Sequence, residues 1–369
     1  MSGSNLNDIH DSLRSNRKES HQYSGHREVE HRQNYIPNLQ TVFVDVPDRD
    51  YISELKNDVT NQRIMNQKYL YIDHNSVGKW KALTRSIKYK TFTNCLSVLT
   101  ELVCSDWWVS KIESGEITQI VDLGAGEGQK TSNLLEGFLD CYKSKEPPKF
   151  VVIDSSFSML ESCMKSIREK LEQSSIAVDF QMIKGDFNHL EKIIGSSQHI
   201  HKGKSLFTML GNTFTNIQEN NFLTNLSRVT IKGDVFICGV EVFTDQELVQ
   251  KELLSSFNHD ELKDFVISTL THLYPTLNRS EIRNIIDLQY AYNNSQYSDV
   301  PNTATARIKT NKDPLSLKDT TDITIATSSR YSKDEFEKFI QQNQFFDLIE
   351  TFSSSISGGS FTYFILARK

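Results

Sequence analysis

The chain has 369 residues, of which 37% are hydrophobic and 24% charged, and its formal net charge is −6. A chain of this size can bury a substantial core, in one large domain or in a core domain with a smaller partner. Lys and Arg are scattered along the sequence, so we do not expect a nucleic-acid partner. There is no run of about 18 apolar residues and no apolar signal core at the N-terminus, so we expect a cytoplasmic protein with no membrane partner.

Residues 1–38 have the composition of a tail, because apolar residues are sparse and the charges are mixed. Such a segment cannot bury enough apolar surface to fold alone, so we expect it to be disordered or to close over a ligand. Histidine is a common metal ligand, but the histidines here are irregularly spaced, and a metal site is the less favoured alternative. The four histidines of this segment are His10, His21, His26 and His31.

The cysteines give no sign of a zinc site or of a disulfide framework. They are odd in number and irregularly spaced, and no two form a CxxC pair. We therefore expect buried, reduced thiols and no metal. The five are Cys95, Cys104, Cys141, Cys163 and Cys238.

Residues 39–92 are predicted to form the N-terminal part of a substrate lobe. The alternation over 41–46 predicts a strand, 51–65 a helix, and 68–89 is dense in aromatic residues. A single long helix is expected to follow. Its apolar face and its end are marked by Leu96, Leu99, Leu102, Val103, Trp107 and Trp108.

Strands and helices then alternate over 93–244, which predicts an α/β core with a parallel, doubly wound sheet and right-handed crossovers. The stretch 117–131 reads as a strand, a glycine turn and the start of a helix. The later strands are predicted at 149–154, 178–187, 205–214 and 234–242, and the helices between them include 156–173 and 220–229.

Residues 245–320 interrupt this alternation with helical segments, the longest over 253–273, and are predicted to complete the substrate lobe. The stretch 293–303 reads as a loop. Residues 321–369 are predicted to return to the core as a strand, a helix over 332–342 and two strands joined by SISGGS. An antiparallel terminal hairpin on a parallel sheet is typical of methyltransferase-type sheets and not of dehydrogenase-type sheets.

The strongest local signal is VDLGAGEGQKT, in which a strand ending at Asp122 leads into Gly124, Ala125 and Gly126. Small residues let the backbone approach a ligand at the carboxyl end of the strand. Dinucleotide binding is the alternative, with pyrophosphate at the helix N-terminus. The acidic start of the turn and Glu127 favour a ligand with a cationic amino group, such as S-adenosylmethionine (SAM).

Two more strand ends carry carboxylates in the expected order. Asp154, followed by Ser155, ends the second strand and suits ribose hydroxyls. Asp186 ends the third strand and suits the exocyclic amine of adenine, with Phe187 packing on the ring. Alternatively, Asp154 only caps the helix that starts at Ser156.

Together these stretches resemble the histidine Nα-methyltransferase-like family of ergothioneine biosynthesis, which also contains dimethylallyltryptophan N-methyltransferases. The resemblance runs from about residue 50 to the C-terminus. It is carried by KYLYIDHNSVGKWKAL, DLGAGEGQKTSNLL, GDFNHL, MLGNTFTNI, and SSRYSKDEFEKFIQQNQF with FTYFILARK.

The resemblance implies a Rossmann-like class I methyltransferase with a second, substrate-binding lobe, and SAM as cofactor with S-adenosylhomocysteine (SAH) as product. Asn216, Tyr71 and Tyr89 would act at the reacting nitrogen. The expected substrate contacts are Asn212, Asn216, Phe257 and Arg307. The expected cofactor contacts are Asp122, Gly124, Ala125, Gly126, Lys130, Asp154, Ser155, Asp186 and Phe187.

One departure bears on the substrate. Histidine-specific members of the family carry an acidic residue and a serine in the late insertion, which read the imidazole. The comparable stretch here, TATARIKTN over 303–311, has no Glu-x-Ser and carries Arg307 and Lys309. We therefore do not expect histidine as substrate. These cations either favour a carboxylate-rich substrate or face solvent from a strand.

The prediction is therefore a SAM-dependent methyltransferase acting on the nitrogen of a small amino-acid-like substrate, with Asn216 aiming the amine lone pair. A protein or peptide methyltransferase is the alternative. A non-catalytic binding protein and an aminopropyl transferase are less favoured. The sequence predicts no oligomeric state.

Overall fold

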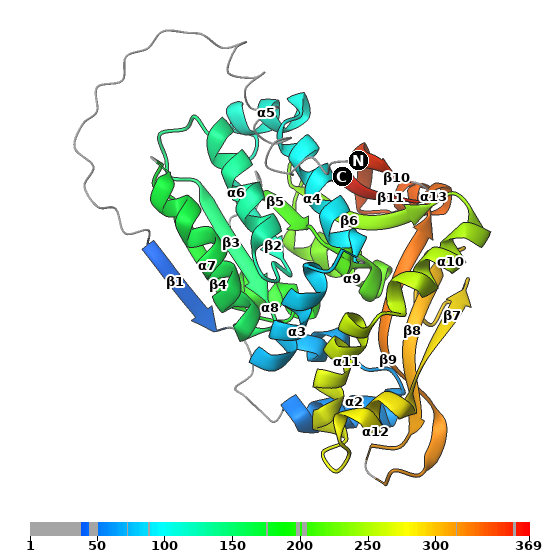
Figure 1. Cartoon of the computed structure of the whole chain (residues 1–369). Helices are drawn as coiled ribbons and strands as arrows, with labels where there is room; N and C mark the ends of the chain where they lie inside the picture. The colour runs from blue at the N-terminus through cyan, green and yellow to red at the C-terminus, as the bar shows by residue number, and fades with distance from the viewer. Residues whose placement is uncertain are drawn as a thin grey trace.

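The alternation of strands and helices predicted for the core is confirmed in the computed structural model (Figure 1). The structure describes residues 38–369 apart from 44–50, 72, 88, 175, 197–199, 201–204, 315 and 357–358. The histidine-containing tail, except its last residue, and the last three residues of the strand predicted at 41–46 lie outside the described residues. Within the described part, no helix is long and apolar enough to cross a membrane.

The core sheet has five parallel strands in the order β4-β3-β2-β5-β6, extended past β6 by the antiparallel pair β11 and β10. This is the predicted class I methyltransferase sheet with its antiparallel C-terminal hairpin. The strands are β2 (Gln119–Leu123), β3 (Lys149–Asp154), β4 (Asp179–Lys184), β5 (Ser205–Met209), β6 (Val235–Phe243), β10 (Phe346–Ile356) and β11 (Gly359–Arg368).

Alternate residues of each core strand pack into two different hydrophobic clusters, because successive side chains point to opposite faces of a sheet. In β2, Ile120 joins the first cluster and Val121 the second. Helices α4 (Lys90–Val103), α5 (Asp106–Glu113), α6 (Gln129–Cys141) and α7 (Phe157–Gln173) cover the first face. The second face is covered by α8 (Leu190–Ser196), α9 (Glu219–Val229) and α13 (Lys333–Gln341).

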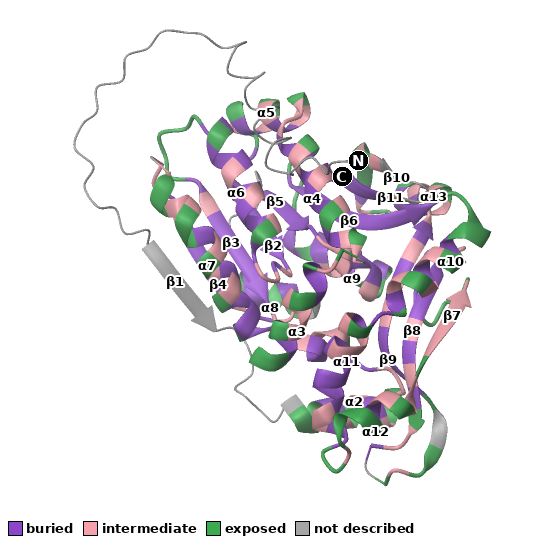
Figure 2. Ribbon diagram, in the orientation of Figure 1, coloured by how far each residue is buried: buried purple, intermediate pink, exposed green. Residues whose placement is uncertain are grey.

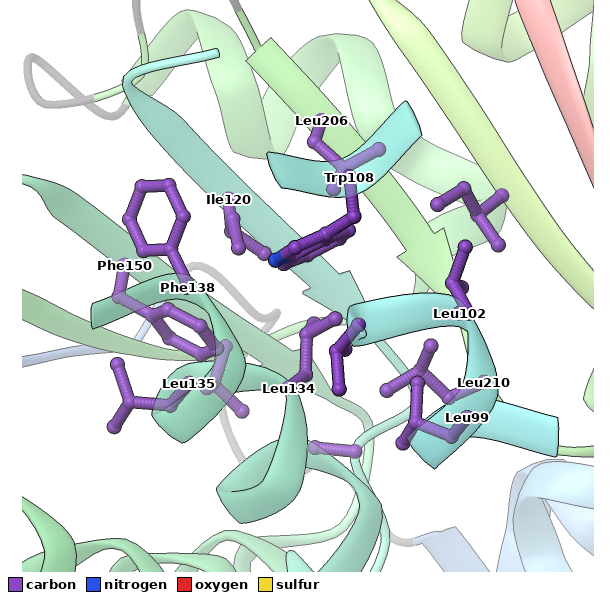
Figure 3. Packing of buried hydrophobic residues seen from close by; sticks show 14 of the residues in the cluster. Leu99, Leu102, Trp108, Ile120, Leu134, Leu135, Phe138, Phe150, Leu206 and Leu210 are labelled. Atoms are coloured by element: carbon purple, nitrogen blue, oxygen red, sulfur yellow. The ribbon is translucent and has the colours of Figure 1, made fainter. Parts of the chain in front are cut away.

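Trp108 lies fully buried in the first cluster, among leucines of α4 and α6 (Figure 3). Its indole Nε1 donates a hydrogen bond to the Gly137 carbonyl at 3.0 Å, which satisfies the one polar atom of the side chain. The central parallel strands β2, β5 and β6 are buried along their whole length (Figure 2), as a sheet covered on both faces requires. This rigid layer fixes the loops at the carboxyl ends of the strands.

A second, antiparallel sheet is formed by β7 (Ile286–Tyr292), β8 (Ala304–Lys312) and β9 (Asp319–Ser332). The end of β9 pairs with the end of β6, so the two sheets are continuous (Figure 1). A third hydrophobic cluster joins this sheet to the surrounding helices. They are α2 (Tyr51–Gln62), the 3₁₀-helix η1 (Gln67–Tyr71), α3 (His74–Thr84), α10 (Gln246–Phe257), α11 (Asp260–Leu273) and α12 (Arg279–Ile285).

Two predicted long helices are each broken. The helix predicted to run through Trp107 and Trp108 ends at Val103, and α5 begins anew because the Ser105 side chain accepts from the Trp108 N–H. The helix predicted over 253–273 is interrupted after Phe257, where the His259 side chain caps α11. Polar side chains that can bond to backbone N–H groups favour such new starts.

Two further segments differ from the sequence prediction. Residues 286–292, predicted within a helical region, form β7, which pairs in antiparallel fashion with β8 across the loop at 293–303. The strand predicted at 41–46 is β1 (Asn38–Phe43), and it pairs in parallel with β4 at the edge of the core sheet instead of joining the substrate lobe. Pairing there provides partners for edge backbone groups of β4.

All five cysteines are free, and four of them are buried. Among the described residues, no group of three or more His, Cys, Asp or Glu side chains could hold a metal ion.

Candidate active site

The glycine turn after β2 adopts a backbone that other residues rarely tolerate. Gly124, Gly126 and Gly128 have φ values of +73°, +59° and +87°. Gly128 is the N-cap of α6, so the turn ends with the first N–H groups of that helix. A side chain at Gly126 would meet no atom within 4 Å, so the backbone there borders open space.

Asp122 stands behind this turn and not in the cavity beside it. Its carboxylate is buried and accepts hydrogen bonds from Thr131 Oγ1 at 2.6 Å and Thr208 Oγ1 at 2.8 Å. Burial raises the pKa of this carboxyl group. Asp122 therefore links α6 to β5. Ala125 is likewise buried in the first cluster, so both predicted cofactor contacts lie outside the cavity lining.

A large cavity lies at the carboxyl ends of β2, β3, β4 and β5, between the core and the second lobe. It encloses about 1390 Å³ of space between protein atoms, part of it open to solvent. It brings together most of the side chains and glycines predicted from the sequence. Those that line it are Tyr71, Tyr89, Gly124, Gly126, Lys130, Asp154, Ser155, Asp186, Phe187, Asn212, Asn216 and Phe257.

Asp154 connects the glycine turn to the helix that follows β3. Its Oδ2 accepts from the Gly126 N–H at 3.1 Å and its Oδ1 from the Ser156 N–H at 2.8 Å. Burial raises the pKa of Asp154 to about 6, although these two bonds favour the ionised form. Capping of α7 itself is done by the Ser156 side chain, which accepts from Met159.

Asp186 and Phe187 form the part of the cavity that follows β4. Lys68 Nζ of η1 lies 3.2 Å from Asp186 Oδ2 in an ion pair that the sequence did not predict. Phe187 packs edge-on against Phe222 at 6.4 Å and borders Gly124, since a Cβ on that glycine would lie 3.7 Å from Phe187. The ring is thus held beside the glycine turn.

The part of the cavity that the second lobe forms has an aromatic wall. The Trp80 ring lies 5.5 Å from Tyr71, 5.9 Å from Tyr89 and 5.3 Å from Phe265. Burial raises the pKa of both tyrosines far above its ordinary value, so their hydroxyls are neutral at physiological pH. Phe257 lines the same part of the cavity. Three other tyrosines of the second lobe, Tyr69, Tyr290 and Tyr292, lie outside the lining.

Asn212 and Asn216 begin and end η3 (Asn212–Asn216), which follows β5. The Asn212 side chain accepts from the Glu241 N–H at 3.1 Å and donates to Ser328 and Ser329 at 3.4 Å, so it fastens β6 to β9. Asn216 makes one long contact, from Thr215 Oγ1 at 3.4 Å. Both asparagines line the cavity, but the Asn212 side chain is largely occupied by its hydrogen bonds to β6 and β9.

Arg307, predicted to bind substrate, lies outside the cavity. Its guanidinium donates to Tyr297 Oη at 2.6 Å and to Gln289 Oε1 at 2.5 Å, on the face of β8 opposite Ala306 and Ile308. The neighbouring strand β9 lines the cavity instead, through Ala326, Thr327 and Ser328. One stretch of the family resemblance, SSRYSKDEFEKFIQQNQF, begins at Ser328 of β9, so the sequence did contain a signal for this strand.

A model of the family described as histidine-specific, SAM-dependent methyltransferases matches residues 49–364. No curated protein sequence matches the chain. Similar solved structures include magnesium protoporphyrin IX methyltransferase from Synechocystis with bound SAH, at 9% identity over 87% of this chain and 100% of that one, with a TM-score of 0.41. A SAM-dependent methyltransferase from Clostridium acetobutylicum matches at 15% identity over 71% and 89%, with a TM-score of 0.38.

The family match spans most of the chain. It includes the glycine turn, the cavity carboxylates Asp154 and Asp186, and the aromatic wall. The protein is therefore a SAM-dependent methyltransferase that belongs to the histidine-specific methyltransferase family.

Proposed function

We propose that the enzyme methylates the amino nitrogen of a small amino-acid-like substrate with an apolar or aromatic side chain, and that histidine is not that substrate. The observation that carries this proposal is the aromatic wall of the cavity, in which the Trp80 ring packs against Tyr71, Tyr89 and Phe265. Among the lining residues that the structure describes, the only carboxylates are Asp154 and Asp186, which we assign to the cofactor. An imidazole would find no acidic partner on the β9 side, where Ala326, Thr327 and Ser328 stand.

The cofactor half suits SAM. Asp154 is a buried carboxylate at the strand end where ribose hydroxyls need an acceptor, and the space beside Gly126 is open. Asp186 would accept from the adenine amine and Phe187 would pack on the ring. Asp122 would act indirectly, by holding the turn through Thr131. When bound, SAM supplies an electrophilic methyl group on a sulfonium sulfur.

The chain's own task is then to align an uncharged amine with that methyl group. The buried tyrosines are poor bases because ionising their hydroxyls inside this wall is costly. The same burial disfavours an ammonium group, so the wall favours the neutral amine. Asn216 would accept one amine hydrogen and so direct the lone pair. Methylation should therefore speed up as pH rises toward the pKa of the bound amine.

The purified protein should release SAH when incubated with SAM and one of a panel of amines, followed by mass spectrometry. The panel contains the twenty amino acids and common amines, and we expect turnover with an apolar or aromatic member and none with histidine. Turnover with histidine alone would contradict the proposal. Silence, with SAH binding confirmed by calorimetry, would favour a peptide or protein substrate. Absence of SAH binding would contradict the cofactor site.

An Asn216→Ala variant should lose roughly 10- to 100-fold in kcat/KM for the amine, because the lone pair is no longer aimed. Its affinity for SAH should stay unchanged. Asn221→Ala is the matched control, since that asparagine is exposed on the following helix. Normal turnover by the Asn216 variant would remove this residue from the reaction.

A further inference from the structure

One short stretch, η1 with α3, contacts all three loops of the cofactor half. Thr84 Oγ1 donates to Glu127 Oε1 of the glycine turn at 2.8 Å. Ser156 Oγ, in the loop after β3, donates to the Tyr71 carbonyl at 2.7 Å. Lys68 Nζ pairs with Asp186, after β4, at 3.2 Å. We call these two helices, η1 (Gln67–Tyr71) and α3 (His74–Thr84), the shared wall.

The shared wall also builds the substrate half. Tyr71 and Trp80 both belong to it, and both pack on Phe265 of α11. The Gln67 side chain reaches β9, where it accepts from the Thr327 N–H at 3.4 Å. Asp73, the N-cap of α3, bonds to His272 Nε2 at 2.8 Å. A small shift of η1 therefore moves the aromatic wall that faces the substrate.

The three contacts differ in what cofactor binding would do to them. Glu127 and the Tyr71 carbonyl have no part in the proposed cofactor contacts, so their bonds can persist. The Asp186 contact differs, because an adenine amine that binds at Oδ2 of this carboxylate competes with the Lys68 ammonium, which is 3.2 Å from the same oxygen. The Lys68 side chain is 22% exposed and that of Asp186 is 13% exposed. Lys68 can therefore leave into solvent, at the loss of an ion pair that is only partly screened.

We propose that Lys68 is a positioning residue through which cofactor binding shapes the substrate site. The adenine amine displaces the Lys68 ammonium from Asp186, and η1 then loses its contact with the loop after β4. The Tyr71 and Trp80 side chains can then adjust their positions around the substrate. Substrate binding thereby follows cofactor binding. This inference rests on the proposed assignment of Asp186 to adenine.

The test compares SAH binding by calorimetry with backbone hydrogen exchange at Gln67–Tyr71. In the wild type, SAH binding should raise the rate of backbone hydrogen exchange at Gln67–Tyr71. Lys68→Met should bind SAH about fivefold more tightly, since the Lys68 ammonium no longer competes for Asp186 Oδ2. In this variant, backbone hydrogen exchange at Gln67–Tyr71 should be fast with or without SAH. Lys68→Gln should behave like Lys68→Met, and Lys68→Arg like the wild type.

Lys309→Met is the matched control, because Lys309 pairs with Asp322 at 2.6 Å in the same lobe but away from the cavity. Equal or weaker SAH binding by both Lys68→Met and Lys68→Gln would overturn the inference while leaving the methyltransferase site intact. Unchanged SAH affinity in Asp186→Asn would overturn the adenine assignment and the inference with it. Failure of the wild type to bind SAH would overturn the cofactor site itself.

Discussion

A Gly128→Ala variant should lose stability and SAH affinity together. The added Cβ would lie 2.5 Å from Cys163 Cα and 2.9 Å from its carbonyl oxygen, and these backbone atoms of α7 cannot rotate away. The φ of +87° adds strain of its own. The left-handed backbone and the overpacking together should cost about 2–5 kcal/mol in the free energy of unfolding. Because α6 and α7 must separate, the turn and Asp154 lose their alignment.

Thermal unfolding and SAH calorimetry check this result. Gly115→Ala provides the control, since Gly115 has a φ of +71° but no atom within 4 Å of an added Cβ. That variant carries the backbone strain without the overlap and lies in the loop after α5, so it should bind SAH normally. If Gly128→Ala melted at the same temperature as Gly115→Ala, contact between α6 and α7 would not determine the shape of the turn.

The sequence placed the residues proposed to hold the cofactor at one cavity because their signals are local. Each buried strand ends in its polar residue, and the carboxyl ends of parallel strands meet at one edge of a sheet. Asp154 and Asp186 therefore had to lie near the glycine turn, and both line the cavity. Asp122 differs because its partner Thr208 belongs to β5, 86 residues away. Thr131 engages one oxygen from within the same motif, but nothing near Asp122 in the sequence indicates that Thr208 engages the other.

The part of the cavity proposed to bind substrate was harder to predict because it depends on register and on distant contacts. A one-residue change in register exchanges the two faces of a strand. Arg307 stands opposite Gln289 of β7 and Thr327 of β9, and its own contacts hold it on the face away from α10 and α11. Lys68 meets Asp186 across 118 residues, with no local sign of that partner. The family resemblance supplied Tyr71 and Asn216, which periodicity alone does not.

An Asp154→Asn variant should lose SAH affinity by at least about 100-fold, the equivalent of one or two charge-assisted hydrogen bonds. Both carboxylate oxygens accept from backbone N–H groups, of Gly126 and Ser156. An amide offers one acceptor oxygen, and its NH₂ group must then face one of those donors. The turn after β2 and the loop after β3 would part, and the ribose hydroxyls would lose an anionic acceptor. Glu161→Gln is the control, because this exposed carboxylate lies on α7, the helix that follows Asp154.

The pH dependence of SAH affinity tests the charge of Asp154 separately from its shape. Burial raises its pKa from 3.8 to about 6 in the folded chain. The folded state thus holds a proton that the unfolded chain releases near pH 4, and this group lowers stability as pH rises from about 4 to about 6. Ribose hydroxyls donate best to the ionised form, so SAH affinity should rise between about pH 5 and 7 in the wild type. Asp154→Asn should show no such rise. Calorimetry at several pH values would contradict the assignment if both proteins gave the same flat profile, since the buried carboxylate would then have no part in holding the cofactor.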